Sequence, residues 1–160
     1  MNKVINDIST LTSQQILSLA LDPNTLPRIC EEGDIPAVKI LIQNNAEVNN
    51  VNKNGSYPIH GAVKSNSEEC VKILLENEVE IDVMDKDNVT SLMIAAERGY
   101  LNILKQLIKF MLELNNETEE LKKNSREYKL LANNFIKMKD SRGQSAIHYA
   151  SKNGQFKNIL

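Results

Sequence analysis

One phrase recurs four times along this chain of 160 residues, and this recurrence restricts the possible folds more than any other feature. The copies come into register when four aliphatic residues are aligned: Leu26, Ile59, Leu92 and Ile147. The first three are 33 residues apart, and the fourth follows after 55, which is one more interval plus an insertion of 22. A fixed period of this length indicates stacked supersecondary units, because a single unit cannot bury its apolar face without its neighbours. We therefore expect an array of repeats.

Each copy carries the start and stop signals of a helix, followed by the apolar stripe of a second helix. The first helix is expected to follow a residue whose side chain accepts free amide hydrogens, and in three copies this residue is Asn24, Thr90 or Ser145. The second copy has Tyr57 in this place and then Pro58, whose fixed φ suits a first turn. Nine residues after each start comes a residue that tolerates the left-handed conformation in which helices end: Gly33, Asn66, Gly99 and Gly154. The runs VKILI, VKILL and ILKQLI then supply the second helices.

In this register the chain resembles the ankyrin repeat family. The resemblance extends from about Asn24 to Leu160, and the copy most similar to the family pattern is DKDNVTSLMIAAERGYLNILKQLI, which begins at Asp85. It implies an all-α fold, an α-solenoid of helix–turn–helix units joined by hairpin loops. The implied repeats cover approximately residues 23–51, 52–84, 85–115 and, as an incomplete copy, 140–160.

The two ends of the chain depart from the repeat pattern. Residues 1–22 are interpreted as an N-terminal helical cap, in which SQQILSLAL forms a helix with Ile16, Leu17 and Leu19 or Ala20 facing inward. The sequence stops inside the fourth copy, so we interpret it as a fragment or as the start of a longer array. The apolar residues of that copy would then lack the helix that covers them.

The third and fourth repeats are separated by a segment, residues 116–136, that is expected to form a helical insertion. No glycine or proline occurs between Gly99 and Gly143, and apolar residues recur at helical spacing within the segment. Two interpretations stay open. The helix would pack against the array, or it would protrude and meet a partner with Tyr128 and Phe135 as anchors.

The two histidines occupy equivalent positions in the second and fourth copies. The resemblance implies that His60 and His148 form hydrogen bonds within their repeats, and no other ligand or nucleophile keeps a constant spacing to them. Cys30 and Cys70 fall on apolar helical positions and are interpreted as small buried hydrophobic residues. The sequence also lacks the phosphate-binding loop, the nucleophile elbow and the zinc-protease motif. We therefore expect no catalytic, cofactor-binding or metal site, and no enzyme activity in this chain.

Composition argues against several other classes of protein. The 19 basic and 21 acidic residues nearly balance, and no basic patch contains interleaved aromatic residues, so binding to nucleic acid is not predicted. No apolar run reaches the roughly 18 residues that suggest a membrane span, and the first residues do not resemble a signal peptide. Two isolated cysteines suit a reducing compartment. We expect a cytoplasmic protein, or one in the cytosol of a host cell if the chain comes from an intracellular microbe.

The resemblance implies a non-catalytic module or scaffold that binds another protein. Two alternatives stay open: a targeting module of a longer enzyme or effector whose catalytic part lies beyond residue 160, or an inhibitor that occludes a partner enzyme. The variable positions of the family, at hairpin tips and at the ends of first helices, give the expected partner-binding residues: Lys53, Asn54, Ser56, Lys64, Lys86, Asp87, Val89, Glu97, Arg98, Arg142, Gln144 and Lys152. Val89 and Arg98 are expected at the energetic centre, since arginine is enriched among interface hot spots. The segment LIQNNAEVN also fits the context in which family members are hydroxylated on asparagine, here Asn49; the alternative is that Asn49 only stabilises the hairpin turn.

Overall fold

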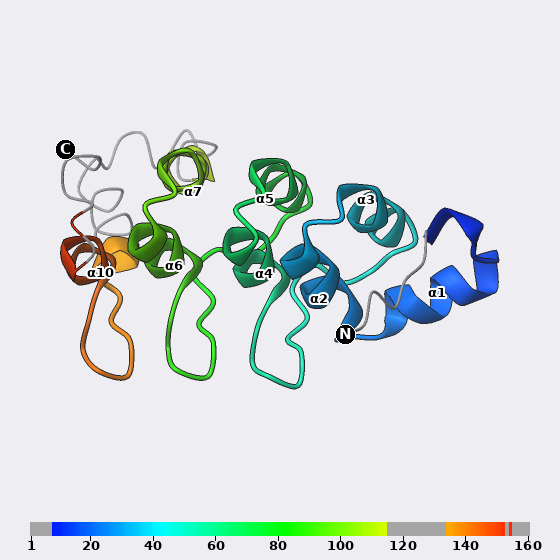
Figure 1. Cartoon of the computed structure of the whole chain (residues 1–160), viewed down its shortest axis with the longest axis horizontal. Coiled ribbons are helices and arrows are strands. Elements are labelled where there is room, and N and C mark those ends of the chain that lie inside the picture. Colours follow the sequence, from blue (N-terminus) through cyan, green and yellow to red (C-terminus); the bar gives the residue numbers. More distant parts are fainter. Residues whose placement is uncertain (1–7, 115–133, 153, 155–160) are drawn as a thin grey trace. The chain divides into compact units, whose positions relative to one another are not determined.

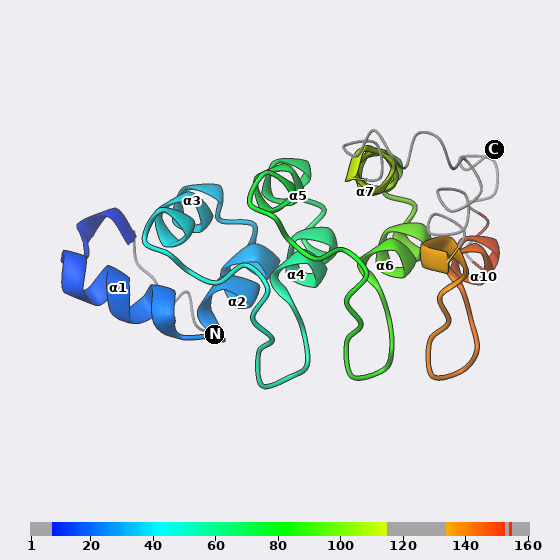
Figure 2. The ribbon, with the colours of Figure 1, turned by 180° about the vertical axis from the view of Figure 1, so that it is seen from behind.

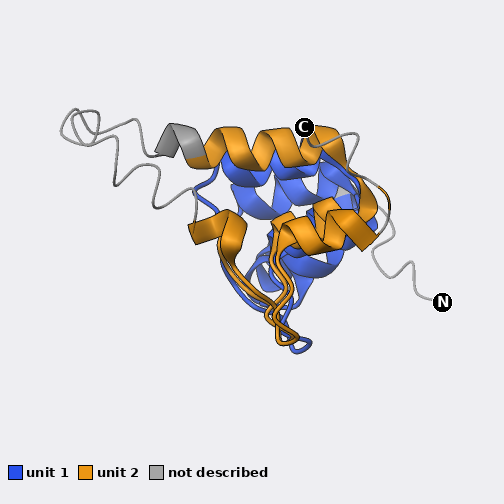
Figure 3. Cartoon of the chain, turned by 90° about the vertical axis from the view of Figure 1, so that its left-hand side faces the viewer, with its two compact units in different colours: residues 1–79 blue, residues 80–160 orange. Residues whose placement is uncertain are grey.

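The computed structural model describes residues 8–114, 134–152 and 154, which form helices joined by turns and hairpin loops (Figure 1). In chain order the helices are η1 (Ile8–Thr10), α1 (Ser13–Leu21), α2 (Thr25–Glu32), α3 (Ile35–Gln43), α4 (Pro58–Lys64), α5 (Glu68–Leu75), α6 (Ser91–Arg98), α7 (Leu101–Leu114) and α10 (Ala146–Lys152). Residues 134–137 form a further helical turn. The chain forms two compact units, Met1–Val79 and Glu80–Leu160, which Figure 3 shows in different colours.

The first unit contains two helix–turn–helix pairs, α2 with α3 and α4 with α5. Figures 1 and 2 show α2 and α4 in one layer of this unit and α3 and α5 in a second layer. Helix α2 packs against α4, and α3 packs against α5. The fully buried side chains of these helices include Ile29, Leu41, Ile59 and Leu74. Burial of each such side chain stabilises the fold by about 1.5–3 kcal/mol, so these contacts supply much of the stability of the unit.

Helices α2 and α4 approach each other closely at Gly61. A Cβ atom added to this glycine would lie 2.5 Å from the carbonyl oxygen of Pro27 and 2.9 Å from the amide nitrogen of Glu31. It would also lie 3.2 Å from the Cβ atom of Cys30. Two of these neighbours are backbone atoms of a helix and cannot rotate away. The equivalent residues of the other copies are Arg28, Ile94 and Tyr149, so glycine occupies this position in the second copy alone.

Helix α1 occupies the segment SQQILSLAL that was predicted to be helical. It packs against α2 and α3, with Ala20 buried and Ile16 and Leu19 half-buried. The inward orientation predicted for Leu17 is wrong, because 46% of this residue is exposed. Successive residues of a helix are separated by about 100°, which places Leu17 roughly 100° from the centre of the face that the other three define. The interpretation of residues 1–22 as a cap stays a prediction.

In the second unit α6 is paired with α7, and α10 packs against α6. The core includes Met93, Ile103 and Leu107, together with Tyr149 from α10. Phe135, in the turn 134–137, is also buried, with 5% of its surface exposed. A side chain enclosed in this way cannot anchor a partner, so that prediction for Phe135 is wrong. Residues 116–133 of the predicted insertion, including Tyr128, lie outside the described residues.

The left-handed conformation predicted at the ends of the first helices is confirmed. The φ angles are 72°, 56°, 68° and 68° at the four positions: Gly33, Asn66, Gly99 and Gly154. A second set of positive φ angles, 74°, 59° and 76°, recurs in the hairpin loops at the same spacing: Gly55, Asn88 and Gly143. Both sets consist of glycine and asparagine, because glycine lacks the Cβ that penalises this conformation and asparagine tolerates it better than most side chains.

The predicted helix N-caps have different outcomes in different copies. The prediction for Thr90 is confirmed, since its hydroxyl accepts a hydrogen bond from the amide of Met93 at 3.3 Å. The prediction for Asn24 is wrong, because its backbone is already helical and its side chain makes no capping bond. The Asn24 amide carbonyl instead accepts a hydrogen bond from the backbone amide of Lys53 at 3.0 Å. Asp22 accepts hydrogen bonds from the backbone amide of Asn24 and the hydroxyl of Thr25, both at 3.1 Å, and the first of these contacts lowers its pKa.

Candidate functional site

Three hairpin loops are built on the same frame of hydrogen bonds. Each begins with a residue whose Oδ1 atom accepts from the amides two and four residues later, at 2.7–2.9 Å: Asn52, Asp85 and Asp140. The backbone amide of the same residue donates to the carbonyl four residues later, and its carbonyl accepts from the left-handed residue three later, at 2.9–3.0 Å. Four hydrogen bonds therefore fix each tip, while the two residues after the first one vary between copies.

These two variable residues are exposed in every hairpin: Lys53 and Asn54, Lys86 and Asp87, and Ser141 and Arg142. The frame itself uses only their backbone atoms. The side chain of Arg142 makes further hydrogen bonds of its own. The predicted tip residues are thus held by a rigid loop that does not depend on their identity.

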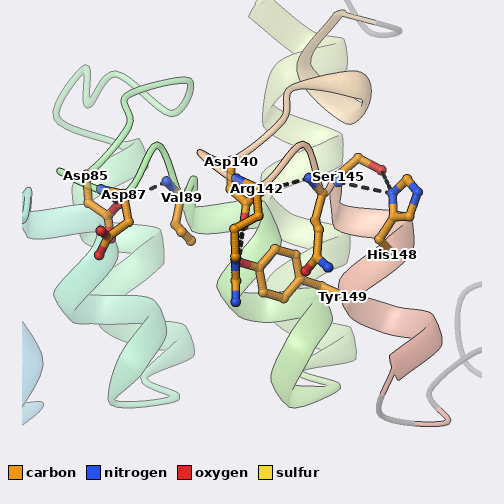
Figure 4. Close-up of polar contacts among 9 residues, drawn as sticks. Asp85, Asp87, Val89, Asp140, Arg142, Ser145, His148 and Tyr149 are labelled. Atoms are coloured by element: carbon orange, nitrogen blue, oxygen red, sulfur yellow. Dashed lines mark hydrogen bonds and ion pairs between the residues drawn. The ribbon is translucent and has the colours of Figure 1, made fainter.

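The two hairpins of the second unit are joined directly. The backbone amide of Ser141 donates to the carbonyl oxygen of Asp87 at 3.0 Å, and Figures 1 and 2 show the two loops side by side. Because the bond joins backbone atoms, it fixes the spacing of the exposed side chains on the two tips. Figure 4 shows the residues on both sides of this junction.

The last hairpin has an additional polar cluster formed by Asp140, Arg142 and Tyr149 (Figure 4). The Oδ2 atom of Asp140 accepts from Nε of Arg142 at 3.0 Å and from the hydroxyl of Tyr149 at 2.8 Å. A further hydrogen bond of 2.6 Å runs from Nη2 of Arg142 to the hydroxyl of Tyr149. Burial of Asp140 would raise its pKa, but the hydrogen bonds from the amide of Gln144 and from Tyr149 and Arg142 outweigh burial and lower the pKa to about 2. The carboxylate is therefore ionised at neutral pH and fixes the conformation of the hairpin.

The structure divides the predicted partner-binding residues into three groups. Seven are exposed: Lys53, Asn54, Lys86, Asp87, Arg98, Arg142 and Lys152. Four are half-buried: Lys64, Val89, Glu97 and Gln144. Ser56 is buried, because it stands where the hairpin returns to the repeat, and its backbone amide donates to Asn52. The side chain of Ser56 is therefore not exposed for the predicted contact with a partner.

The two histidines form the intra-repeat hydrogen bonds that the family resemblance implied. The Nδ1 atom of His60 accepts from the amide of Tyr57 at 3.2 Å, and that of His148 accepts from the amide of Ser145 at 3.1 Å. The hydroxyl of Ser145 lies 2.8 Å from the same ring nitrogen of His148. Both rings thus accept from the amide that precedes their helix, which requires Nδ1 to be unprotonated.

The two cysteines are fully buried, as predicted, and both are free thiols. Contact with the thiol of Cys70 and burial raise the pKa of Cys30, and this disfavours the reactive thiolate. In the parts of the chain that the structure describes, no group of three or more histidine, cysteine, aspartate or glutamate side chains is arranged to hold a metal ion.

Asn49, the predicted hydroxylation site, lies in the turn after α3. It is half-buried, and its side-chain amide donates to the carbonyl of Glu78 at 3.3 Å. The side chain thereby joins the ends of the first and second copies, and the modification itself stays a prediction.

Sequence reasoning missed three residues that organise the hairpins: Asn52, Asp140 and Tyr149. A signal for the first two was present, because a residue with an Oδ1 acceptor recurs at the spacings of 33 and 55. Tyr149 gave no such signal, since the equivalent residues are Gly61 and Ile94.

Comparison with known proteins identifies the repeat. A family model described as ankyrin repeats, in three copies, matches residues 26–118, which is more than half of the chain. This match confirms the predicted family and the all-helical repeat fold. A search of curated proteins found no match. Over the described ranges, every helix is too short or too polar to cross a membrane.

Proposed function

Since the chain belongs to the ankyrin repeat family, whose members generally bind other proteins, we propose that it recognises a partner protein through its hairpin tips and the ends of its first helices. The observation that carries this proposal is the recurring hairpin frame. It fixes the backbone in the same way three times and presents a different exposed pair at each tip. A rigid frame with variable side chains lowers the entropy cost of binding.

The proposed contact is polar and non-catalytic. Lysine, arginine, aspartate and amide side chains occupy the exposed positions, and complementary charge of this kind governs specificity and association rate. Val89 is half-buried beside Lys86 and Asp87, and Arg98 is exposed at the end of α6. We place the energetic centre at Val89 and Arg98.

The test begins with a partner captured on the immobilised chain, identified by mass spectrometry and then titrated as a purified protein. Arg98→Ala is expected to weaken binding by about 2 kcal/mol or more if this residue is a hot spot. The control is Lys72→Ala, which removes an exposed cation of α5 that lies 3.9 Å from Glu76. A partner whose affinity is insensitive to changes at Lys86, Val89 and Arg98, but is lost on deletion of residues 117–133, would move the site to the insertion.

A further inference from the structure

Arg142 differs from the other exposed cations at the hairpin tips because its guanidinium is held in one orientation. Its Nε donates to the carboxylate of Asp140 at 3.0 Å and its Nη2 to the hydroxyl of Tyr149 at 2.6 Å. The guanidinium carbon also lies 5.8 Å from the centre of the Tyr149 ring. Both partners are buried residues, so they move little and the arginine is preorganised.

These internal bonds occupy one edge of the guanidinium. The Nε–H bond and one N–H bond of Nη2 lie along the edge of the guanidinium that faces Asp140 and Tyr149. The opposite edge, formed by Nη1 and the second hydrogen of Nη2, carries two nearly parallel N–H bonds, which is the geometry that receives a carboxylate in a bidentate pair. The side chain of Arg142 as a whole is 59% exposed, and no hydrogen bond among the described residues uses this edge.

The tip and helix-end positions of the second unit carry more cations than acids, and one of these cations, Arg142, is itself ion-paired with Asp140. In the second unit the tip and helix-end positions hold four cations and two acids: Lys86, Arg98, Arg142 and Lys152 against Asp87 and Glu97. The equivalent positions of the first unit hold Lys53 and Lys64 with Glu31 and Glu32, of which Glu32 is ion-paired with Arg28. The backbone bond from Ser141 to Asp87 holds the Lys86 tip beside the Arg142 tip. The Arg142 tip thus lies beside a second exposed cation.

We propose that the hairpin surface of the second unit binds an acidic segment of a partner protein, with the outer edge of Arg142 receiving one of its carboxylates. This inference rests on the proposed function and specifies the chemistry of the partner. A segment with spaced carboxylates fits better than a continuous phosphate backbone, because Lys86 and Arg98 are each adjacent in sequence to an acid, Asp87 or Glu97, which would repel closely spaced phosphates.

The probe is a short fluorescent peptide of alternating glutamate and alanine, titrated with the 160-residue chain and followed by anisotropy at low and at physiological salt. Arg142→Lys keeps the charge but loses the two parallel donors, and it is expected to weaken binding about tenfold. The matched control is Arg28→Lys, since Arg28 is also an ion-paired arginine, bonded to Glu32 at 2.7 Å, but belongs to the first unit. It should leave the affinity unchanged.

A second variant tests the same surface without altering the hairpin that holds Arg142. Lys86→Gln removes an exposed charge from the neighbouring tip, and it is expected to weaken binding about twofold to fivefold and to reduce its dependence on salt. Failure of the wild-type chain to bind the peptide would overturn the inference, as would equal losses in the Arg142 and Arg28 variants. Binding of single-stranded RNA with the same dependence on Arg142 would also overturn it. If a captured partner depends on Arg98 but not on Arg142, the acidic-segment inference fails while the proposed function stands.

Discussion

Substitution of Gly61 by alanine tests the packing of α2 against α4, because two opposite effects meet at this position. In an ordinary helix the change stabilises, since alanine loses less backbone entropy than glycine, and the gain is about 0.5–1 kcal/mol. Here the new Cβ would lie 2.5 Å from the carbonyl oxygen of Pro27 and 2.9 Å from the amide of Glu31. Relief of the first contact requires the helices to separate by about 0.8 Å, given normal non-bonded distances.

The steric effect should exceed the gain in helix propensity. Overpacking of a well-packed core destabilises by about 1–3 kcal/mol, and here the opposing atoms belong to the backbone of a helix, which moves only as a unit. Separation would also loosen the contacts of Ile29 and Ile59, both of which are fully buried. The expected net loss for Gly61→Ala is about 1–2 kcal/mol in the free energy of unfolding.

Urea unfolding followed by circular dichroism would measure this loss, and hydrogen exchange would locate it in α2 and α4. The control is a pair of variants at Ser18, an exposed residue of α1, and it measures helix propensity alone. The alanine variant should be more stable than the glycine variant by about 0.5–1 kcal/mol. If Gly61→Ala proves as stable as the wild-type chain or more stable, while the Ser18 pair behaves as expected, the inferred close approach of the helices is refuted.

Three further predictions concern the polar residues. Asp140→Asn should lower the melting temperature more than Asp85→Asn does. An amide suffices for the shared hairpin frame, since Asn52 occupies the equivalent position of the first hairpin. Asp140 in addition accepts hydrogen bonds from Arg142 and Tyr149 through its second oxygen. Since the pKa of Asp140 is lowered from 3.8 to about 2, the stability it contributes is complete above pH 3.8 and is lost as the pH falls towards 2, and acid unfolding of Asp140→Asn should lack this contribution. His60→Ala should destabilise by about 1–3 kcal/mol in thermal or urea unfolding, and His148→Ala by less, because His60 is buried and His148 is exposed. Treatment with an asparaginyl hydroxylase followed by mass spectrometry should add one oxygen at Asn49, and an unmodified peptide would reject that site.

The features predicted best from the sequence depend on local sterics. Gly33 and Gly99 end their helices in the left-handed conformation because few other residues adopt it, and this requirement does not depend on the rest of the fold. Thr90 caps its helix for a similarly local reason. Asparagine also favours the N-cap position, and this preference predicts a cap at Asn24. Asp22, two residues earlier, accepts the amide hydrogen of Asn24, and the Asn24 side chain instead accepts a hydrogen bond from the next hairpin.

The features predicted poorly depend on which surfaces meet. Phe135 lies on an apolar stripe, and the stripe indicates that the residue is covered without indicating by what. Ser56 is polar and occupies a variable position, yet the hairpin turns it inward. Gly61 has no sequence signal for the close approach of α2, because glycine in a helix also occurs where nothing packs against it.

The aliphatic residue that leads each phrase shows how far sequence register determines burial. Three of these residues are buried, at 3%, 0% and 2% exposure, whereas the fourth is 54% exposed: Leu26, Ile59, Leu92 and Ile147. In the first unit α4 packs against α2, and in the second unit α10 packs against α6, so Leu26 and Leu92 lie on helices that a following first helix covers. All four residues are aliphatic, so residue type alone does not explain the difference. For Leu26 and Leu92, burial is a property of the pair of adjacent first helices and not of the residue by itself.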